Sequence, residues 1–157
     1  MHEETFIKHN QKYDFMQAFK TDIQRQTLHK ELSRLSFVLK GEMELIQGQN
    51  LFESAVFNSE NLDTDAIYDA LDSCNNAKNI AFNNLDTELE VRCEAFNGLI
   101  YWRGLKYLVS ADKQKQYVLK AKTHMSNAVR LEATLRPRNC STEEWFIKCK
   151  RNLMEIN

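Results

Sequence analysis

The chain has 157 residues, of which 43% are hydrophobic and 27% are charged, and its formal net charge is −1. This composition is ordinary for a globular protein and excludes a chain that is disordered throughout. With four glycines and one proline, the chain lacks the turn residues that a β-sheet protein needs in number. The sequence therefore predicts an all-α protein, with residues 1–157 forming a single domain.

The location of the protein is predicted from what the sequence lacks. No window holds 18 consecutive apolar residues, so we expect no membrane-spanning helix. Residues 1–5 are acidic and polar, which is the opposite of a secretory signal. We therefore expect a cytoplasmic or nuclear protein with reduced thiols. The cysteines show no CxxC spacing and are expected to pack between helices; they are Cys74, Cys93, Cys140 and Cys149.

The N-terminal third predicts an arm followed by a long helix. Residues 1–22 are interpreted as an N-terminal arm or short helix. From residue 23 to residue 57, apolar residues recur at steps of three and four, as on one stripe of a helix. Gly41 and Gly48 lie inside this pattern, where a bend or break can occur. The stripe consists of Leu28, Leu32, Leu35, Leu39, Met43, Ile46, Leu51, Phe52 and Ala55.

Two helices are predicted in the middle of the chain. The first runs over residues 67–81 and has Asp63 or Thr64 as its N-cap. Thr87 and Glu90 form a capping box that opens the second. That helix carries an apolar pattern as far as Tyr107.

Two more helices are predicted near the C-terminus. Residues 118–135 have a helical apolar pattern, and Pro137 ends it. Ser141 and Glu144 form a second capping box, which opens a final helix over residues 141–156. The sequence thus predicts five to six helices.

Short connections between these helices predict antiparallel hairpins. Residues 23–82 form the first hairpin and residues 87–135 the second. Residues 141–156 then pack as a C-terminal capping helix.

The segment from Ala70 to Pro137 resembles a pair of tetratricopeptide (TPR)-like repeats. Small residues face large ones at helical spacing, and an acidic connection at residues 83–90 joins the two parts. The residues that carry this resemblance are Ala70, Cys74, Ala77 and Ile80, then Ala95, Gly98 and Tyr101, and finally Ala121, Met125 and Ala128.

The resemblance implies stacked helical hairpins with a concave binding face. Within the 34-residue repeat of the family, the small residues of the first and second helices are about a dozen positions apart, whereas Gly98 and Ala121 are 23 apart, so the helices here are longer than standard ones. An irregular helical bundle is the alternative architecture.

No set of residues predicts catalysis or a cofactor. The histidines lack metal-ligand spacing, and no Cys/His set has the spacing of a zinc site. Cys93 and His124 can meet across neighbouring helices, but a core cysteine and a surface histidine are the favoured interpretation. We therefore predict that the protein is not an enzyme, and we expect neither a metal nor a cofactor.

The sequence favours a protein–protein interaction or scaffold module that binds a peptide or helix of another protein. The repeat resemblance implies a groove lined by the helix that follows Thr87, and tryptophan and arginine are common interface anchors. The lining residues that it implies are Arg92, Ala95, Leu99, Trp102, Arg103 and Lys106. An acidic peptide or helix would suit the predicted partner-binding residues, which are Arg92, Trp102, Arg103 and Lys106.

Two alternatives remain open. The long apolar stripe of residues 28–57 predicts a helical subunit of a homo-oligomeric or multi-protein assembly. Residues 1–99 hold 9 Lys/Arg against 17 Asp/Glu, whereas residues 100–157 hold 12 against 5. This basic C-terminal third is a weaker indication of nucleic-acid binding. Its candidate patch consists of Lys113, Lys115, Lys120, Lys122, Arg130, Arg136 and Arg138.

Overall fold

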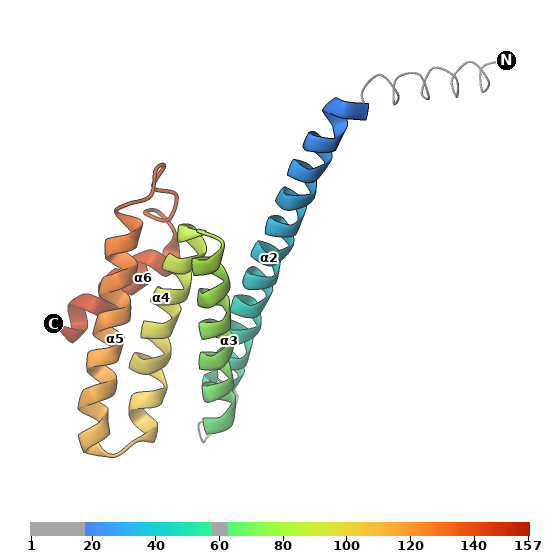
Figure 1. Ribbon diagram of the computed structural model, residues 1–157. Coiled ribbons are helices and arrows are strands. Elements are labelled where there is room, and N and C mark those ends of the chain that lie inside the picture. Colours follow the sequence, from blue (N-terminus) through green and yellow to red (C-terminus); the bar gives the residue numbers. More distant parts are fainter. Residues whose placement is uncertain (1–17, 58–62) are drawn as a thin grey trace. The chain divides into compact units, whose positions relative to one another are not determined.

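The computed structural model describes residues 18–57 and 63–157, apart from the side chains of residues 18–23, 25 and 57. Within these ranges the chain forms five α-helices and one short 3-10 helix, with no strand (Figure 1). The predicted all-α class is therefore confirmed. Of the described helices, none combines the length and the apolarity needed to cross a bilayer. The predicted arm at residues 1–22 lies outside the described residues as far as residue 17.

The elements follow one another as α2 (Ala18–Phe57), α3 (Thr64–Asn83), α4 (Thr87–Arg103), η1 (Leu105–Leu108), α5 (Ala111–Glu132) and α6 (Glu144–Ile156). The chain divides into two compact units, residues 1–36 and residues 37–157, and α2 passes from one to the other. The packing described below concerns residues 37–157. The prediction of one domain with two hairpins stays a prediction.

Acidic side chains cap the two middle helices. At the start of α3 the Asp63 carboxylate accepts a hydrogen bond from the Ala66 amide at 3.1 Å, which confirms one of the two predicted caps. At the start of α4 it is Asp86, not Thr87, that caps the helix, accepting from the Leu89 amide at 3.2 Å. The N-cap of α4 therefore lies one residue before the predicted one, because the Asp86 carboxylate and not the Thr87 hydroxyl accepts the capping hydrogen bond.

The capping box predicted for the last helix was wrong. The Ser141 hydroxyl donates to the Arg138 carbonyl instead, at 2.9 Å. Glu143 occupies the N-cap position of α6 and forms no side-chain capping bond. A local turn therefore uses the serine before the helix begins.

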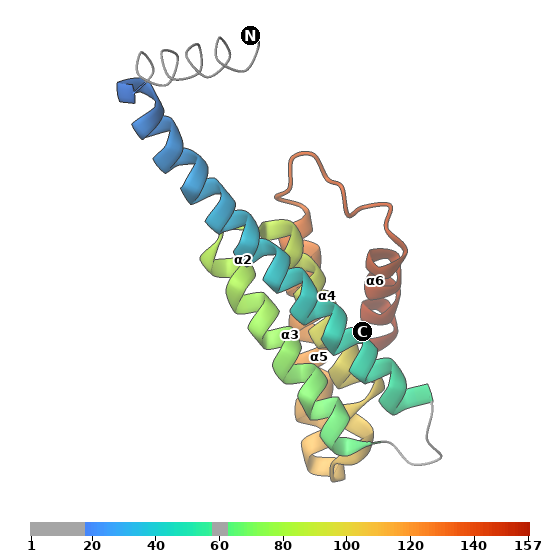
Figure 2. The same cartoon turned by 90° about the vertical axis from the view of Figure 1, so that its right-hand side faces the viewer.

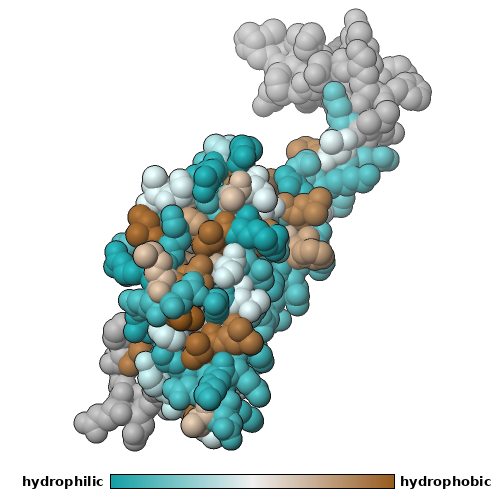
Figure 3. Space-filling view, turned by 90° about the vertical axis from the view of Figure 1, so that its left-hand side faces the viewer, coloured by the Kyte–Doolittle hydropathy of each residue, from teal (hydrophilic) through white to brown (hydrophobic). Residues whose placement is uncertain are grey.

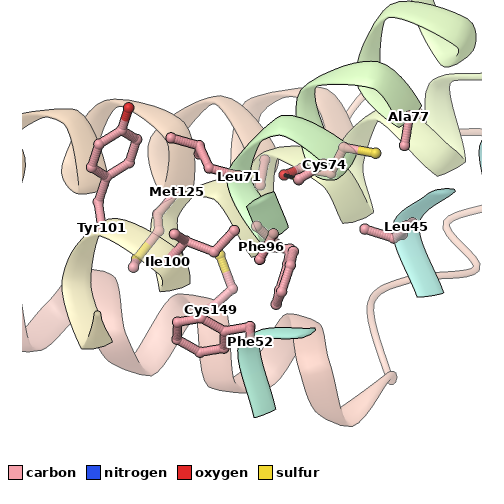
Figure 4. Close-up of a cluster of buried hydrophobic side chains, with 14 of the residues drawn as sticks. Leu45, Phe52, Leu71, Cys74, Ala77, Phe96, Ile100, Tyr101, Met125 and Cys149 are labelled. Atoms are coloured by element: carbon pink, nitrogen blue, oxygen red, sulfur yellow. Dashed lines mark hydrogen bonds between the residues drawn. The ribbon is translucent and has the colours of Figure 1, made fainter. Parts of the chain in front are cut away.

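Helix α4 lies at the centre of the unit formed by residues 37–157. Helices α3, α4 and α5 run side by side in both views (Figures 1 and 2), and α6 also contacts α4 and α5. Every residue from Cys93 to Gly98 is buried. Figure 4 shows part of the resulting core, with contributions from Leu45 and Phe52 of α2, Met125 of α5 and Cys149 of α6. Because α4 is covered on several sides, no single stripe of it forms the core.

Small residues permit the close crossing of α4 and α5. A Cβ atom at Gly98 would lie only 3.1 Å from the Ala121 carbonyl oxygen and would also collide with Met125. The small and large residues predicted to interlock there do so. Nothing in this packing distinguishes a TPR-like repeat from an irregular bundle, so the resemblance stays a prediction.

The face of α2 that packs in the core shares only Phe52 and Ala55 with the stripe predicted from the sequence. Its buried residues follow steps of three and four, and they are Gly41, Leu45, Gly48, Phe52 and Ala55. A Cβ atom at Gly48 would lie 3.1 Å from the Ala70 carbonyl oxygen of α3. The helix continues unbroken through both glycines. They let α2 lie close to its neighbours.

Most of the predicted stripe is exposed. Phe52 and Ala55 are buried and Leu51 is half-buried. In residues 37–157, Leu39, Met43 and Ile46 are exposed, by 63%, 70% and 48%. In residues 1–36, the exposed members are Leu28, Leu32 and Leu35.

Truncation of one leucine on each face of α2 tests this assignment. Leu45 is completely buried, so Leu45→Ala removes packed atoms and is expected to lower the free energy of unfolding by about 2–5 kcal/mol. Leu39→Ala, the matched control, is expected to change it by less than about 0.5 kcal/mol. Urea denaturation followed by circular dichroism measures both, and equal losses would contradict the assignment.

Candidate functional site: a groove between three helices

A groove of about 680 Å³ lies between α2, α4 and α6. It is lined from α2 by Gln49 and Glu53, from α4 by Glu88, Arg92, Ala95, Phe96 and Leu99, and from the α6 region by Glu143, Glu144, Trp145, Lys148, Cys149 and Asn152. All of these residues belong to the unit 37–157. The groove therefore depends on packing within one unit.

The floor of the groove is apolar and uncharged. Ala95, Phe96 and Cys149 are buried, while Leu99 and Trp145 are half-buried. Trp145 and Phe96 come from different helices, so the floor exists only once α4 and α6 have packed together. Burial raises the pKa of the Cys149 thiol to about 12, so this cysteine stays protonated and neutral near pH 7.

The rim of the groove is rich in carboxylates. Glu53, Glu88, Glu143 and Glu144 are all exposed. The Glu144 carboxylate lies 3.4 Å from the Lys148 ammonium, whereas no cation of the described ranges pairs with the other three. The rim therefore carries more negative than positive charge.

Only one of the four predicted partner-binding residues lines the groove. Arg92 does so, but its guanidinium lies 2.6 Å from the Glu42 carboxylate of α2, which neutralises it. Arg103 donates to Asn152 at 3.3 Å and to Glu155 at 3.2 Å, both on α6. Neither arginine presents an unpaired charge.

The other two predicted residues lie together where α4 ends, Trp102 in the last turn of α4 and Lys106 in η1. The Lys106 ammonium is 3.3 Å from the centroid of the Trp102 ring, a close cation–π contact. Trp102 is half-buried and packs against the core. The structure thus separates Trp102 and Lys106 from Arg92, and their role in binding stays a prediction.

The residues of the predicted basic patch are exposed but do not share one face. Lys113 and Lys120 lie seven residues apart on one side of α5, while Lys115 and Lys122 lie about 200° further around it. The Arg138 guanidinium is bound to the buried Glu132 carboxylate at 2.9 and 2.5 Å.

The remaining two members of the predicted basic patch are Arg130 and Arg136. Arg130 is exposed on α5, and Arg136 donates to the backbone carbonyls of Ala133 and Leu135. On the face shown in Figure 3, hydrophobic side chains lie at several places among hydrophilic ones, as on most protein surfaces.

A buried carboxylate joins α3, α4 and α5. The Glu94 side chain is almost completely buried and forms an ion pair with Lys78 of α3. It also lies 2.9 Å from His124 Nδ1 and accepts a hydrogen bond from Asn127 at 3.4 Å, both on α5. Burial acts to raise the pKa of Glu94, but the hydrogen bonds and charges of His124 and Lys78 outweigh it, so its pKa is lowered.

The same contacts show which partners the two residues of the cysteine–histidine pair considered from the sequence, Cys93 and His124, have in the structure. His124 is directed at Glu94 and stacks on Tyr101 with the ring centroids 5.8 Å apart. The Cys93 carbonyl accepts the Cys74 thiol at 3.2 Å. All four cysteines are free and buried. Cys74, Cys93 and Cys149 pack in the helical core as predicted, whereas Cys140 lies in the turn before α6. Among the described residues, no group of three or more His, Cys, Asp and Glu side chains could hold a metal ion.

Sequence reasoning missed the Glu94 cluster and the α6 side of the groove. Glu94 lies three residues after Val91 and four before Gly98, both buried, so its position on an apolar row was a usable signal. Trp145 and Cys149 were expected to pack, but nothing in their spacing indicated that they would face α4 across a groove.

Comparisons with known proteins identified no relative of this chain. The chain matches no protein-family model, no curated protein and no solved structure.

Neutralising the buried carboxylate tests the Glu94 cluster. Glu94→Gln is expected to lower the free energy of unfolding by about 1–3 kcal/mol at neutral pH, because Lys78 and His124 lose a charged partner. Since the pKa of Glu94 is lowered in the folded chain, its contribution is present above the ordinary glutamate pKa and disappears as the pH falls toward the lowered value.

The variant should therefore show a flatter dependence of stability on pH in the acid range. Urea denaturation at a series of acid pH values measures this dependence. Glu90→Gln, on the same helix but half-exposed, is the matched control. Parallel curves for the wild type and Glu94→Gln would show that the cluster contributes nothing to acid stability.

Proposed function

We propose that this chain is a non-catalytic protein–protein interaction module whose groove binds a helix or peptide of a partner protein. The preformed groove between α2, α4 and α6 is the observation that carries the proposal. Ligand sites and interfaces commonly combine an apolar centre with a polar rim, and this groove has both.

The floor residues suit a binding role. Phe96 and Trp145 supply aromatic surface, which contributes strongly to binding when a partner covers it. The protonated Cys149 thiol adds an apolar contact rather than a reactive group. Four free and buried thiols also suit the reducing cytosol or nucleus that we propose as its location.

A charge placed in the floor tests the proposal. Leu99→Glu leaves part of the side chain in solvent but puts a carboxylate where the partner's apolar side chains would lie, so binding should weaken by at least about tenfold. The measurement is calorimetric titration with a set of amphipathic helical peptides that have apolar faces.

Leu119→Glu is the matched control, because Leu119 is exposed on α5 and does not line the groove. It should bind the same peptides as the wild type does. Thermal unfolding of each variant separates loss of binding from loss of fold. Equal binding by Leu99→Glu and the wild type would place the binding surface elsewhere.

A second candidate function is a helical subunit of an assembly. It is favoured by the exposed apolar residues of α2, because runs of such residues commonly mark surfaces that pair with another chain. Leu39, Met43 and Ile46 carry this surface in residues 37–157. Their spacing of four and three continues in sequence from Leu28, Leu32 and Leu35, as in a helix that pairs through a seam.

Sedimentation velocity at micromolar concentrations tests the second candidate. If α2 pairs with a second copy, the wild type should sediment as a dimer or larger, and Leu39→Gln with Met43→Gln should shift it toward the monomer. Ile147→Gln with Met154→Gln makes the same exchange on exposed positions of α6 and is the control. A wild type that is monomeric throughout would exclude homo-assembly.

A further inference from the structure

We infer that the partner segment bound by the groove is a basic amphipathic helix. The inference rests on the proposed function, since it names the kind of segment that the groove between α2, α4 and α6 binds. Three properties of the groove carry it: the chemistry of its floor, its length along α4 and the sign of its rim.

The floor favours an occupant whose backbone is already hydrogen-bonded. The buried and half-buried side chains there present hydrocarbon surface, an indole ring and a neutral thiol. The walls are helices, whose internal backbone groups bond within each helix. An extended peptide would find few partners for its own N–H and C=O groups in such a place. A helix satisfies its backbone internally and needs only an apolar face.

The groove is long enough for a short helix. The α4 residues that line it run from Glu88 to Leu99, and at 1.5 Å per residue this stretch is about 16 Å long, or three helical turns. A helix of three turns presents apolar side chains at positions i, i+3, i+4 and i+7 to such a wall. A segment of about 12–14 residues therefore matches the site.

The rim selects the sign of the occupant's charge. Glu53 extends from α2, Glu88 from α4 and Glu143 from the start of α6, so carboxylates stand on all three walls. In the described part of the chain none of these three has a cationic partner. The two cations of the lining are both paired, Arg92 with Glu42 and Lys148 with Glu144. Lysines or arginines on the polar flanks of a docked helix would meet unpaired carboxylates on every side.

The charge inferred for the partner helix is opposite to that of the acidic partner predicted from the sequence. That prediction counted Arg92, Arg103 and Lys106 as available charges, but Lys106 does not line the groove and lies over the Trp102 ring. In the structure both guanidinium groups already bind carboxylates. A direct comparison of peptides of opposite charge decides between the two.

Three 14-residue helical peptides provide the probe. They share one apolar face of leucine and phenylalanine and carry lysine, glutamine or glutamate on the polar face. The lysine peptide is expected to bind at least about tenfold more tightly than the glutamate peptide, with the glutamine peptide between them. Its affinity should fall between 50 and 200 mM salt, because exposed charges are screened. Fluorescence anisotropy of labelled peptides against the full chain measures all three.

Charge variants of the protein locate the effect. Glu53→Gln, Glu88→Gln and Glu143→Gln together should weaken the lysine peptide by about tenfold and leave the glutamine peptide nearly unchanged. Asp69→Asn, Asp72→Asn and Asp112→Asn together are the control. They change the net charge equally at exposed positions outside the groove and should have little effect. Glu88 lies in the first turn of α4, where acidic residues stabilise a helix, so thermal unfolding is recorded for both sets.

The outcomes separate the inference from the proposed function. If the glutamate or glutamine peptide binds as tightly as the lysine peptide, and Leu99→Glu abolishes that binding, the groove binds helices but the basic partner is wrong. If a lysine peptide with a scrambled apolar face binds equally well, the helix inference is wrong. If none of the peptides binds, both the inference and the groove as a helix-binding site fail.

Discussion

The burial of α4 is the constraint on which the rest of the structure depends. Helices α3, α5 and α6 contact it, and α2 reaches it through Glu42 and Phe52, whose ring lies 5.7 Å from that of Phe96. A helix covered on several sides cannot keep one polar face, so a charged residue on it is stable only with partners inside the protein. Glu94 meets this requirement through Lys78 and His124. The cluster thus joins three helices at the point where apolar packing alone would leave a charge unpaired.

The groove is a consequence of the same arrangement. Helices α2 and α6 both reach α4, and the surface of α4 between them is left as a floor. That floor is fixed by the core below it, since Phe96 and Cys149 belong to the main hydrophobic cluster. A partner would therefore meet a preformed surface and would not have to order the protein on binding. The carboxylates on the rim can then act on orientation and on the rate of encounter, because they need not form the site.

The proposed groove and the exposed apolar residues of α2 make different use of that helix. One side of α2 carries Leu45 and Phe52 into the core, and Glu53 stands beside the groove. Leu39 and Met43 lie away from both. An interaction module and a subunit of an assembly are therefore compatible readings of the chain, and each is tested by substitutions that leave the other surface intact.

The sequence by itself determined the helical class and the approximate position of the described helices, because apolar spacing and capping residues act over a few neighbouring positions. The start of α5 was predicted at residue 118, seven residues after the observed start at Ala111. On α2 the sequence predicted one stripe, rich in leucine, whereas the buried face has the same three- and four-residue steps but contains Gly41 and Gly48. Only the tertiary structure revealed this face, because the glycines allow α3 and α4 to approach closely, and that gain depends on the shape of the neighbours. The pairing of Arg92 with Glu42, fifty residues away, was likewise decided by the fold, and with it the sign of the charge around the groove.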